Sequence, residues 1–345
     1  MCRRLYTAIA IAVIAAVILS IVLVPPLRSC LAPRVAALGG RCPIIAVYFY
    51  VWYGRHRHWN ESLSSLVIDR PLIGFYSSDN DSVIRWQLSK LREAGVDALF
   101  ISWWGPGSYE DRVAQKVFRY LKRYGLKAAI LVEPFKPWSI LNASQVYGPQ
   151  FWRTVLSYIY KHFIEPYPDV YLRIGGKPLV LCFAPVGVFY RPHDPRFVIR
   201  VVATFVDLIN ALRFLGLHAD WDLWPNYLLY TNASSIELRI RVDGYVALTP
   251  RYYPAPCVLG YYPDGCWVGY LDPHYRQRIY VREWEWVIHH LKQIHIIAIY
   301  SWNEYHERSE IEPHIDATAS NGLYPYEVTK EFAHLVHELC HRGSP

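Results

Sequence analysis

Short apolar runs rich in β-branched residues alternate with amphipathic stretches of helical length through most of this 345-residue chain. The runs are almost continuously hydrophobic, which is typical of parallel strands that are covered on both faces. They occupy positions 44–51, 96–102, 128–133, 178–184, 227–231, 244–248 and 296–301, and the helical stretches occupy 82–94, 111–124, 151–163, 197–215 and 280–293. This alternation predicts an α/β fold, a (β/α)8 TIM-type barrel, whose remaining strand we expect between 257 and 271.

An apolar segment near the N-terminus is longer than any of these runs. Of the 20 residues at 5–24, 18 are hydrophobic, and Arg3 and Arg4 precede them. A helix of this length spans about 30 Å, the thickness of the hydrocarbon core of a bilayer. A cleaved signal peptide would have a shorter apolar region and a small-residue cleavage site, which does not follow here. We therefore expect a single-pass N-terminal transmembrane helix: a membrane anchor at 1–26, a linker at 27–40 and one domain at 41–340.

The charges that flank the anchor indicate on which side of the membrane the domain lies. Positive residues beside an anchor stay in the cytoplasm, so we expect an extracytoplasmic domain, at the cell surface or in a lumen. Four Asn-x-Ser sequons, which begin at positions 60, 80, 142 and 232, agree with export. Two cysteine pairs are possible, Cys257 with Cys266 and Cys30 with Cys42, but the seven cysteines leave the pairing open.

Charge and motif content disfavour several classes of protein. The net charge is +7, but the basic residues form no blocks, so we expect no nucleic-acid partner. The chain has no P-loop, no Gly-x-Ser-x-Gly nucleophile elbow and no dinucleotide fingerprint, which disfavours ATPases, esterases and Rossmann enzymes. His306, Glu310 and His314 leave a metal-dependent hydrolase as a rival hypothesis. No His-Glu-x-x-His or similar spacing supports it, and we expect neither a metal nor another cofactor.

Aromatic and acidic residues stand at the ends of the predicted strands, where a structural loop would carry Gly, Asn or Ser. The carboxyl ends of the strands build the active site in α/β barrels. Sugar C–H faces pack on aromatic rings and carboxylates bind hydroxyl groups, so this combination predicts a carbohydrate site. The candidate substrate-binding residues are Tyr50, Trp52, Tyr53, His58, Trp59, Trp103, Trp104, Glu133, Asn303 and Tyr305.

Two carboxylates, Glu304 and Glu307, follow the last predicted strand directly. Glycosidases generally need one protonated and one ionised carboxyl group. A spacing of three residues places both on one side of a helical turn, where each raises the proton affinity of the other. We predict that these two are the catalytic residues. The alternative is a solvated acidic loop that also contains Glu310 and Glu312, and Glu133 could equally form an ion pair.

Several motifs occur in a fixed order along the predicted domain. Tyr-Phe-Tyr-Val-Trp-Tyr-Gly at 48–54 precedes His-Trp-Asn at 58–60, Ser-Trp-Trp at 102–104 and Val-Glu-Pro-Phe at 132–135. Ser-Trp-Asn-Glu-Tyr-His-Glu at 301–307 and Ile-Glu-Pro at 311–313 follow the last predicted strand. In this order the motifs resemble those of glycoside hydrolase family 99, the endo-α-mannosidases and endo-α-mannanases.

The resemblance implies a (β/α)8 enzyme that cleaves within the α-mannosyl chains of an oligosaccharide or polysaccharide and retains the anomeric configuration. Glu304 matches the residue that draws the proton from the 2-hydroxyl of the sugar, which then attacks the anomeric carbon and forms a 1,2-anhydro sugar. Glu307 matches the residue that protonates the leaving oxygen and afterwards activates water.

The chain departs from the family pattern at two places that bear on specificity. The Gly-Thr-Gln of the family is Arg-Ser-Glu at 308–310, which adds charge beside the acid. Its Tyr-Asp-Ser-Tyr after the fourth strand is replaced by Phe-Ala-Pro-Val at 183–186. The alternative function is a non-catalytic glycan-binding or surface-polysaccharide assembly protein on the same barrel.

Overall fold

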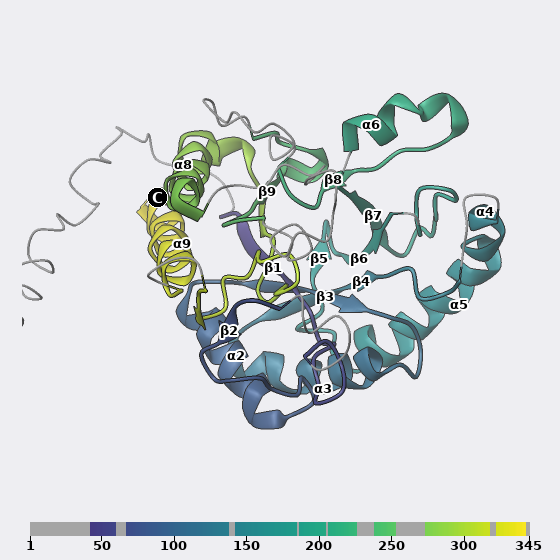
Figure 1. Cartoon of the computed structure of the whole chain (residues 1–345). Coiled ribbons are helices and arrows are strands. Elements are labelled where there is room, and N and C mark those ends of the chain that lie inside the picture. Colours follow the sequence, from purple (N-terminus) through teal and green to yellow (C-terminus); the bar gives the residue numbers. More distant parts are fainter. Residues whose placement is uncertain are drawn as a thin grey trace, which may run out of the picture.

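Eight parallel strands form a nearly closed barrel at the centre of the molecule, with the larger helices around its outside (Figure 1). The computed structural model describes residues 42–59, 67–137, 142–184, 186–204, 206–225, 238–252, 273–317 and 322–342. The barrel strands, in spatial order, are β8 (Trp221–Asp222), β7 (Val198–Ala203), β6 (Lys177–Phe183), β4 (Lys127–Val132), β3 (Ala98–Trp103), β1 (Ile44–Phe49), β10 (Ile296–Ile299) and β9 (Tyr245–Leu248). The predicted α/β barrel is confirmed.

The first and last strands of the barrel are neighbours in space. β1 pairs in parallel with β10, with Val47 opposite Ile299, and with β3, with Phe49 opposite Ile101. Both flanking strands are buried along their whole length, as the continuous apolar runs predict. This pairing brings the aromatic residues after β1 and the acidic residues after β10 to the same end of the barrel.

The helices begin and end where local chemistry favours it. α3 (Tyr109–Tyr124) begins after Ser108, whose hydroxyl accepts from the backbone N–H of Asp111, and ends at Gly125, whose φ of 64° is left-handed. The predicted helices at 82–94, 111–124, 151–163 and 280–293 are confirmed. The remaining helices are α2 (Asp81–Glu93), α4 (Ala143–Val146), α5 (Pro149–Ile159) with a π turn (Tyr160–Ile164), α6 (Val206–Ala211), α8 (Pro273–His290) and α9 (Tyr324–Arg342).

The prediction of one helix over 197–215 is wrong. Its first part is the strand β7, which pairs in parallel with β6, and the helix α6 that follows is short. The run Val-Ile-Arg-Val-Val-Ala is rich in β-branched residues, which favour a strand in a buried sheet. Between β6 and β9 the barrel contains β7 and β8. The strands expected at 227–231 and between 257 and 271 lie outside the described residues.

β8 and β9 meet at the seam of the barrel through side chains. The rings of Trp221 and Tyr245 stack at 4.3 Å between centroids, and the Tyr245 hydroxyl donates to the carbonyl of Asp222 at 2.6 Å. Beside the barrel, β2 (Arg70–Pro71) pairs antiparallel with β11 (His314–Ile315), and β5 (Arg173–Ile174) pairs antiparallel with β6. The β2–β11 pair lies next to the segment that carries the candidate catalytic residues.

The predicted membrane anchor at 5–24 and the linker at 27–40 lie outside the described residues. Within the described ranges, none of the helices combines the length and the apolar character that crossing a bilayer requires. Cys30, Cys257 and Cys266 also lie outside these ranges, so neither expected cysteine pair is tested. Cys42 instead interacts with Cys340 of α9, where burial, followed by the hydrogen bond with Cys42, raises the pKa of the Cys340 thiol to about 12.

Candidate active site

The segment after β10 forms a loop whose two ends are joined by backbone hydrogen bonds. The N–H of Ser301 donates to the carbonyl of Ser309 at 2.8 Å, and the N–H of Ile311 donates to the carbonyl of Ser301 at 3.0 Å. The N–H of Trp302 donates to the carbonyl of Tyr48 at 2.8 Å, which ties the loop to β1. The Ser301 hydroxyl also accepts from the N–H of Glu304 at 2.8 Å. The backbone that presents Glu304 and Glu307 is therefore fixed at its base.

Three carboxylates from two strand ends lie close to one phenol. Burial raises the pKa of Tyr50 well above its usual value, and the charges of Glu304, Glu133 and Glu307 raise it further, in that order. Tyr50 follows β1, Glu133 follows β4, and the other two lie in the loop after β10. The structure thus brings the predicted catalytic pair together with Glu133 at one end of the barrel.

Two of these carboxyl groups hold their protons near neutral pH. Burial is the largest cause that raises the pKa of Glu307 to about 8, and the charge of Glu304 adds to it. Burial likewise raises the pKa of Glu133 to about 8, against a hydrogen bond from the Ser102 hydroxyl at 3.0 Å. The ion-pair alternative for Glu133 finds no support in these interactions. A buried carboxyl group with a raised pKa suits a general acid.

Glu304 is surrounded by donors from its own loop. Its Oε1 lies 3.0 Å from the backbone N of His306, which donates to it, and 3.1 Å from the Nδ1 of the same residue. The side chain is buried. Donors aimed at one oxygen fix the orientation of the carboxyl group. Glu304 and Glu307 therefore have different surroundings.

Three partly exposed rings, those of Trp52, His58 and His306, lie close together beside these carboxyl groups. Trp52 stacks on Tyr50 at 4.4 Å and on His58 at 4.5 Å, and His58 lies 5.3 Å from His306 between ring centroids. Within the part of the chain that the structure describes, Trp52 Nε1, His58 Nδ1 and His306 Nε2 are buried atoms without a hydrogen-bond partner. Buried polar atoms are almost always paired, so three unpaired atoms in one cluster suit a site that binds a polar ligand.

Burial also determines the protonation of His58. It lowers the pKa of this imidazole to about 4, and the charges of His306 and Arg57 lower it further. His58 is therefore neutral at physiological pH. Trp104 is partly exposed in the same region, and its Nε1 donates to the Ser102 hydroxyl at 3.2 Å. The predicted residues that retain surface near the carboxyl groups are thus Trp52, His58 and Trp104.

Other predicted substrate-binding residues are buried, and their hydrogen bonds hold the segments of the site together. The Tyr53 hydroxyl donates to the carbonyl of Asn303 at 2.8 Å and accepts from the N–H of Tyr305 at 3.1 Å. The Asn303 side chain bonds both backbone groups of Tyr50, at 2.9 Å and 2.8 Å. These contacts join the loop after β10 to the segment after β1. Direct sugar contact by these side chains stays a prediction, and their burial favours a positioning role.

Trp59 and Trp103, two of the predicted substrate-binding tryptophans, are also buried and hydrogen-bonded within the protein. Trp59 stacks on Tyr53 at 4.0 Å, and its Nε1 donates to the carbonyl of Tyr76 at 2.6 Å. Trp103 is fully buried, and its Nε1 donates to Asp111 at 2.8 Å, which connects β3 to α3. Exposed surface, rather than residue type, distinguishes these rings from Trp52 and Trp104.

The alternative of a solvated acidic loop is wrong, because Glu304, Glu310 and Glu312 are all buried. Glu312 accepts hydrogen bonds from the hydroxyls of Tyr76 and Tyr305, both at 2.9 Å, and from the Gln87 amide at 2.8 Å. Burial raises the pKa of Glu312 to about 7. Tyr76, Gln87 and Glu312 are not among the predicted site residues, although the Ile-Glu-Pro motif at 311–313 points to this region.

Comparisons with known proteins agree with this geometry. No family model matches the chain. A solved structure of the GH99 endo-alpha-mannosidase from Bacteroides thetaiotaomicron superposes with a TM-score of 0.63 at 17% identity, covering 86% of this chain and 98% of that one. Its complex with BIS-TRIS-propane gives a TM-score of 0.61 at 18% identity, covering 87% and 98%. These structures support the barrel fold.

Sequence relatives cover most of the same region. The mouse glycoprotein endo-alpha-1,2-mannosidase-like protein is 21% identical over 344 residues, 80% of this chain and 71% of the relative. The mouse glycoprotein endo-alpha-1,2-mannosidase is 21% identical over 347 residues, 80% of this chain and 69% of the relative. These similarities support an assignment to glycoside hydrolase family 99. We therefore place it among the endo-acting glycoside hydrolases.

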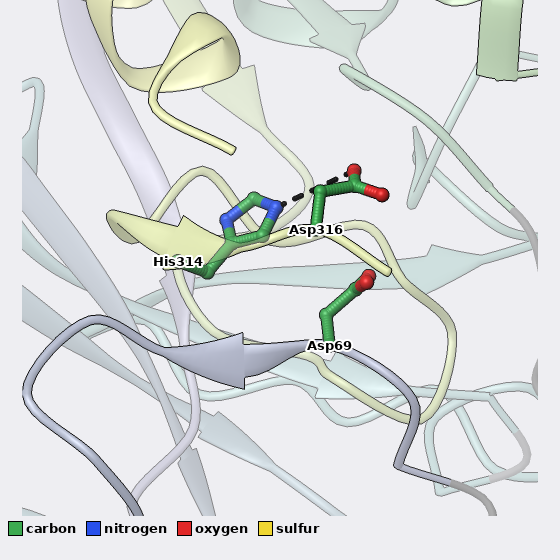
Figure 2. A group of neighbouring side chains, drawn as sticks. All are labelled: Asp69, His314 and Asp316. Carbon is green, nitrogen blue, oxygen red and sulfur yellow. Dashed lines mark ion pairs between the residues drawn. The ribbon is translucent and has the colours of Figure 1, made fainter. Parts of the chain in front are cut away.

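A buried ion-pair network lies beside the carboxylate loop. Asp69, His314 and Asp316 point toward one another (Figure 2), with ligand atoms within 4.8 Å of each other, a geometry that could hold a metal. Arg251 already pairs with Asp69 at 2.6 Å and with Asp316, and its Nη2 lies 2.8 Å from His314 Nε2. Arg308 adds two bonds to Asp69 at 2.7 Å and 2.8 Å. Because guanidinium groups already neutralise these carboxylates, the residues fit an ion-pair network better than a metal centre.

The network contains two of the residues at 308–310, where the sequence has Arg-Ser-Glu in place of the Gly-Thr-Gln of family 99. Arg308 is fully buried and pairs with Asp69 and Asp316, and Glu310 pairs with Arg251. Burial is the largest cause that raises the pKa of Glu310 to about 7. The expectation of added charge beside the acid therefore needs correction, since the charged side chains are directed into a buried, compensated cluster.

Proposed function

We propose that this chain is a retaining endo-α-mannosidase of glycoside hydrolase family 99 that cleaves α-mannosidic or closely related α-linked glycans. The observation that carries the proposal is the contrast between its two loop carboxyl groups. Glu307 has a pKa raised to about 8 by burial and by its neighbour, while Glu304 accepts a hydrogen bond from the backbone N–H of His306 and lies 3.1 Å from the Nδ1 of the same residue. The names of the mouse relatives and of the Bacteroides enzymes support an α-mannosidic substrate.

In the proposed first step, the Glu304 carboxylate takes the proton of the 2-hydroxyl of the sugar. The 2-oxygen forms a bond to the anomeric carbon as the bond to the leaving oxygen breaks, and Glu307 gives its proton to that oxygen. In the second step, water attacks the anomeric carbon of the 1,2-anhydro sugar, and the bond from that carbon to the 2-oxygen breaks. Glu307 takes a proton from the water, and the 2-oxygen recovers its proton from Glu304. Two inversions at one carbon give overall retention.

We infer the roles of the surrounding side chains from exposure and unpaired atoms. Trp104 offers a ring face to the sugar, and the unpaired atoms of Trp52, His58 and His306 offer polar contacts. Glu133, protonated near neutral pH, can donate to a sugar oxygen as well as accept from one. The non-catalytic alternative is not favoured, because a binding protein gains nothing from carboxyl groups buried at the cost of desolvation.

The proposal is tested with the variants Glu304→Gln and Glu307→Gln on a panel of α-mannosyl oligosaccharides. We expect a loss of kcat/KM of about 10²- to 10⁴-fold for each variant, the range that general acid–base catalysis contributes. An activated substrate whose leaving group needs no proton should restore much of the rate of Glu307→Gln and little of the rate of Glu304→Gln. Glu165→Gln, on the exposed surface after α5, is the matched control. Wild-type rates for both loop variants would disprove the assignment.

We also propose that residues 5–24 anchor the enzyme in a membrane with the barrel on the extracytoplasmic side. The length of the apolar segment, its Arg-rich flank and the sequons support this placement. Fractionation of cells that express the full chain, with and without residues 1–26, tests it. Release of the full chain from membranes by carbonate washing would contradict the anchor.

A further inference from the structure

We propose that Tyr300 is a positioning residue that directs the proton of Glu307 to one carboxylate oxygen and stabilises that group when it is ionised. This inference rests on the proposed role of Glu307 as the acid. Tyr300 lies directly after β10 and is not among the residues that the sequence motifs indicate. It has almost no exposed surface, so it acts on the substrate only through Glu307.

The first step of the argument is the hydrogen bond itself. The Tyr300 hydroxyl donates to Glu307 Oε2 at 2.5 Å, at the short end of the range for O–H···O hydrogen bonds. Burial, followed by the charge of Glu307, raises the pKa of Tyr300 well above its usual value. Tyr300 is therefore a donor at every pH at which the enzyme works. With Oε2 occupied as an acceptor, the catalytic proton of the neutral acid resides on Oε1.

The second step is the direction of the hydrogen-bond chain. The Tyr50 hydroxyl donates to the Tyr300 hydroxyl at 3.3 Å, so the oxygen of Tyr300 is an acceptor and its own proton is directed to Glu307. The chain runs from the end of β1 to the end of β10 and then to the loop. Hydrogen bonds in series polarise one another, which strengthens the last donor.

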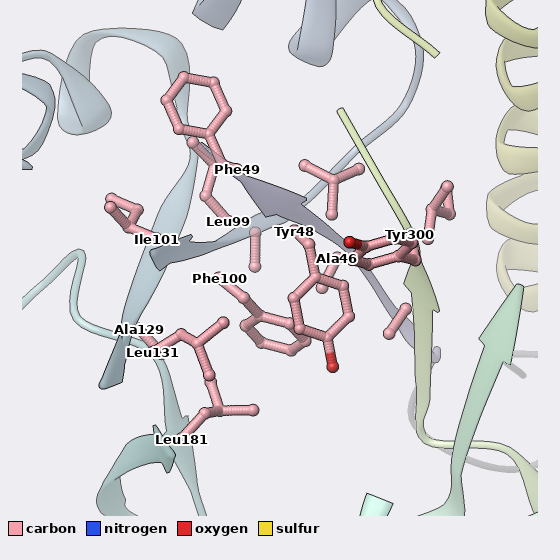
Figure 3. Close-up of a cluster of buried hydrophobic side chains, with 14 of the residues drawn as sticks. Ala46, Tyr48, Phe49, Leu99, Phe100, Ile101, Ala129, Leu131, Leu181 and Tyr300 are labelled. Carbon is pink, nitrogen blue, oxygen red and sulfur yellow. The ribbon is translucent and has the colours of Figure 1, made fainter. Parts of the chain in front are cut away.

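The third step is the rigidity of the Tyr300 ring. It contacts Tyr48 edge to face at 5.6 Å and Trp224 at 5.5 Å between centroids, and Figure 3 shows Tyr300 and Tyr48 in the buried cluster of the barrel. The backbone of Tyr300 is held on both sides, because its N–H donates to Leu248 and its carbonyl accepts from the Thr249 hydroxyl, both at 2.8 Å. The phenol therefore keeps its direction as Glu307 gains and loses its proton.

The chemical consequence follows from these contacts. When Glu307 protonates the leaving oxygen, the O–H bond at Oε1 breaks and a bond from that proton to the leaving oxygen forms. The carboxylate that remains is stabilised by Tyr300 at Oε2, and Oε1 is free to take the proton of the attacking water. The other groups that act on Glu307 are Glu304 in its own loop and Glu133 at the end of β4, and both favour the protonated acid.

The test is Tyr300→Phe, which removes the hydroxyl and retains the ring. We expect kcat to fall about 10- to 100-fold with little change in KM, because the lost bond is to a charge that develops in the transition state. We also expect the alkaline limb of the pH–kcat profile to move up by about one unit, since the hydrogen bond from Tyr300 favours the ionised acid. Tyr280→Phe is the matched control, because this buried phenol bonds Thr329 at 2.7 Å between α8 and α9.

A direct titration keeps the proposal separate from the proposed function. The side-chain carboxyl ¹³C signal of Glu307, assigned by its absence in Glu307→Gln, should titrate at higher pH in Tyr300→Phe than in the wild type. An unchanged titration overturns the proposal, whether or not mannosides are substrates. If Tyr300→Phe does not fold, 3-fluorotyrosine at position 300 retains the shape with a stronger donor, and the titration should then move to lower pH. Full activity of Glu307→Gln would instead disprove the proposed function and leave the titration result standing.

Discussion

At the scale of single residues, the carboxyl groups of the site acquire their properties from burial and from one another. Glu133 and Glu307 both have a pKa raised to about 8, and burial is the largest cause for each. Among the residues that the structure describes, no basic side chain is one of the groups that shift either pKa. A neutral carboxylic acid at pH 7 is what the first step of the proposed reaction requires at position 307.

We predict an alkaline limit of activity from this raised pKa. Because Glu307 must be protonated to assist the leaving group, kcat/KM should stay high below about pH 8 and fall above it, as the acid ionises. The apparent pKa of this alkaline limit is a property of the interacting carboxyl groups together, since the charges of Glu304 and Glu133 raise the pKa of Glu307. A pH–rate profile of the wild type measures it, and a profile that falls instead between about pH 5 and 6 would contradict the assignment.

The same pKa also affects stability. The folded-state pKa of Glu307 is raised above that of the unfolded chain, so the folded state loses stability as pH rises from about 4.5 to about 8. A glutamine side chain carries no charge, so Glu307→Gln should unfold at a higher temperature than the wild type at about pH 9, and the difference should shrink at about pH 5. Thermal unfolding at the two pH values measures this effect. An equal difference at both would show that folding does not raise the pKa of Glu307.

At the scale of elements, the ion-pair network connects the β2–β11 pair to the carboxylate loop. Burial alone would raise the pKa of Asp69, but Arg251 and Arg308 outweigh it and hold that pKa below its usual value. Asp69 also accepts from the backbone N–H of Ala317 at 2.8 Å. One buried carboxylate therefore connects the segment before β2 with residues on both sides of β11.

We predict that Asp69→Asn destabilises the protein by about 3–5 kcal/mol, because it removes one of the two carboxylates that both buried guanidinium groups share. Chemical denaturation measures the change. Asp194→Asn is the matched control: its ion pair with Arg196 is more exposed, and its loss should cost about 0–1 kcal/mol. Equal changes for the two variants would show that the network contributes no more than a surface pair.

At the scale of the whole molecule, the barrel closes through the contact between β8 and β9. Trp221 is fully buried, stacks on Tyr245, and donates from its Nε1 to the carbonyl of Val242 at 2.9 Å. Most other neighbouring strands are joined by longer backbone ladders. The stability of the closed barrel thus depends strongly on a few side chains at this seam.

We predict that Trp221→Ala lowers the free energy of unfolding by about 3–5 kcal/mol, the usual range for removing a large buried aromatic side chain. Phe214→Ala is the control, because Phe214 is 80% exposed and its removal should change stability little. Denaturation curves for both variants decide the matter. A small effect for Trp221→Ala would mean that the seam does not limit stability.

The sequence alone determined the barrel class, the first and last strands of the barrel and the acidic loop after β10. Continuous apolar runs and the residue types that follow them are local properties of the sequence. It did not reveal β7, since the run at 198–203 is compatible with a helix until its pairing with β6 is known. The motifs identified Glu304 and Glu307, but only the tertiary structure decided that Trp103 is buried while Trp52 keeps exposed surface. It also decided that Arg308 pairs with Asp69, 239 residues away in sequence, and that Tyr300 bonds Glu307. Burial and partner choice depend on contacts between distant segments, and periodicity carries no information about them.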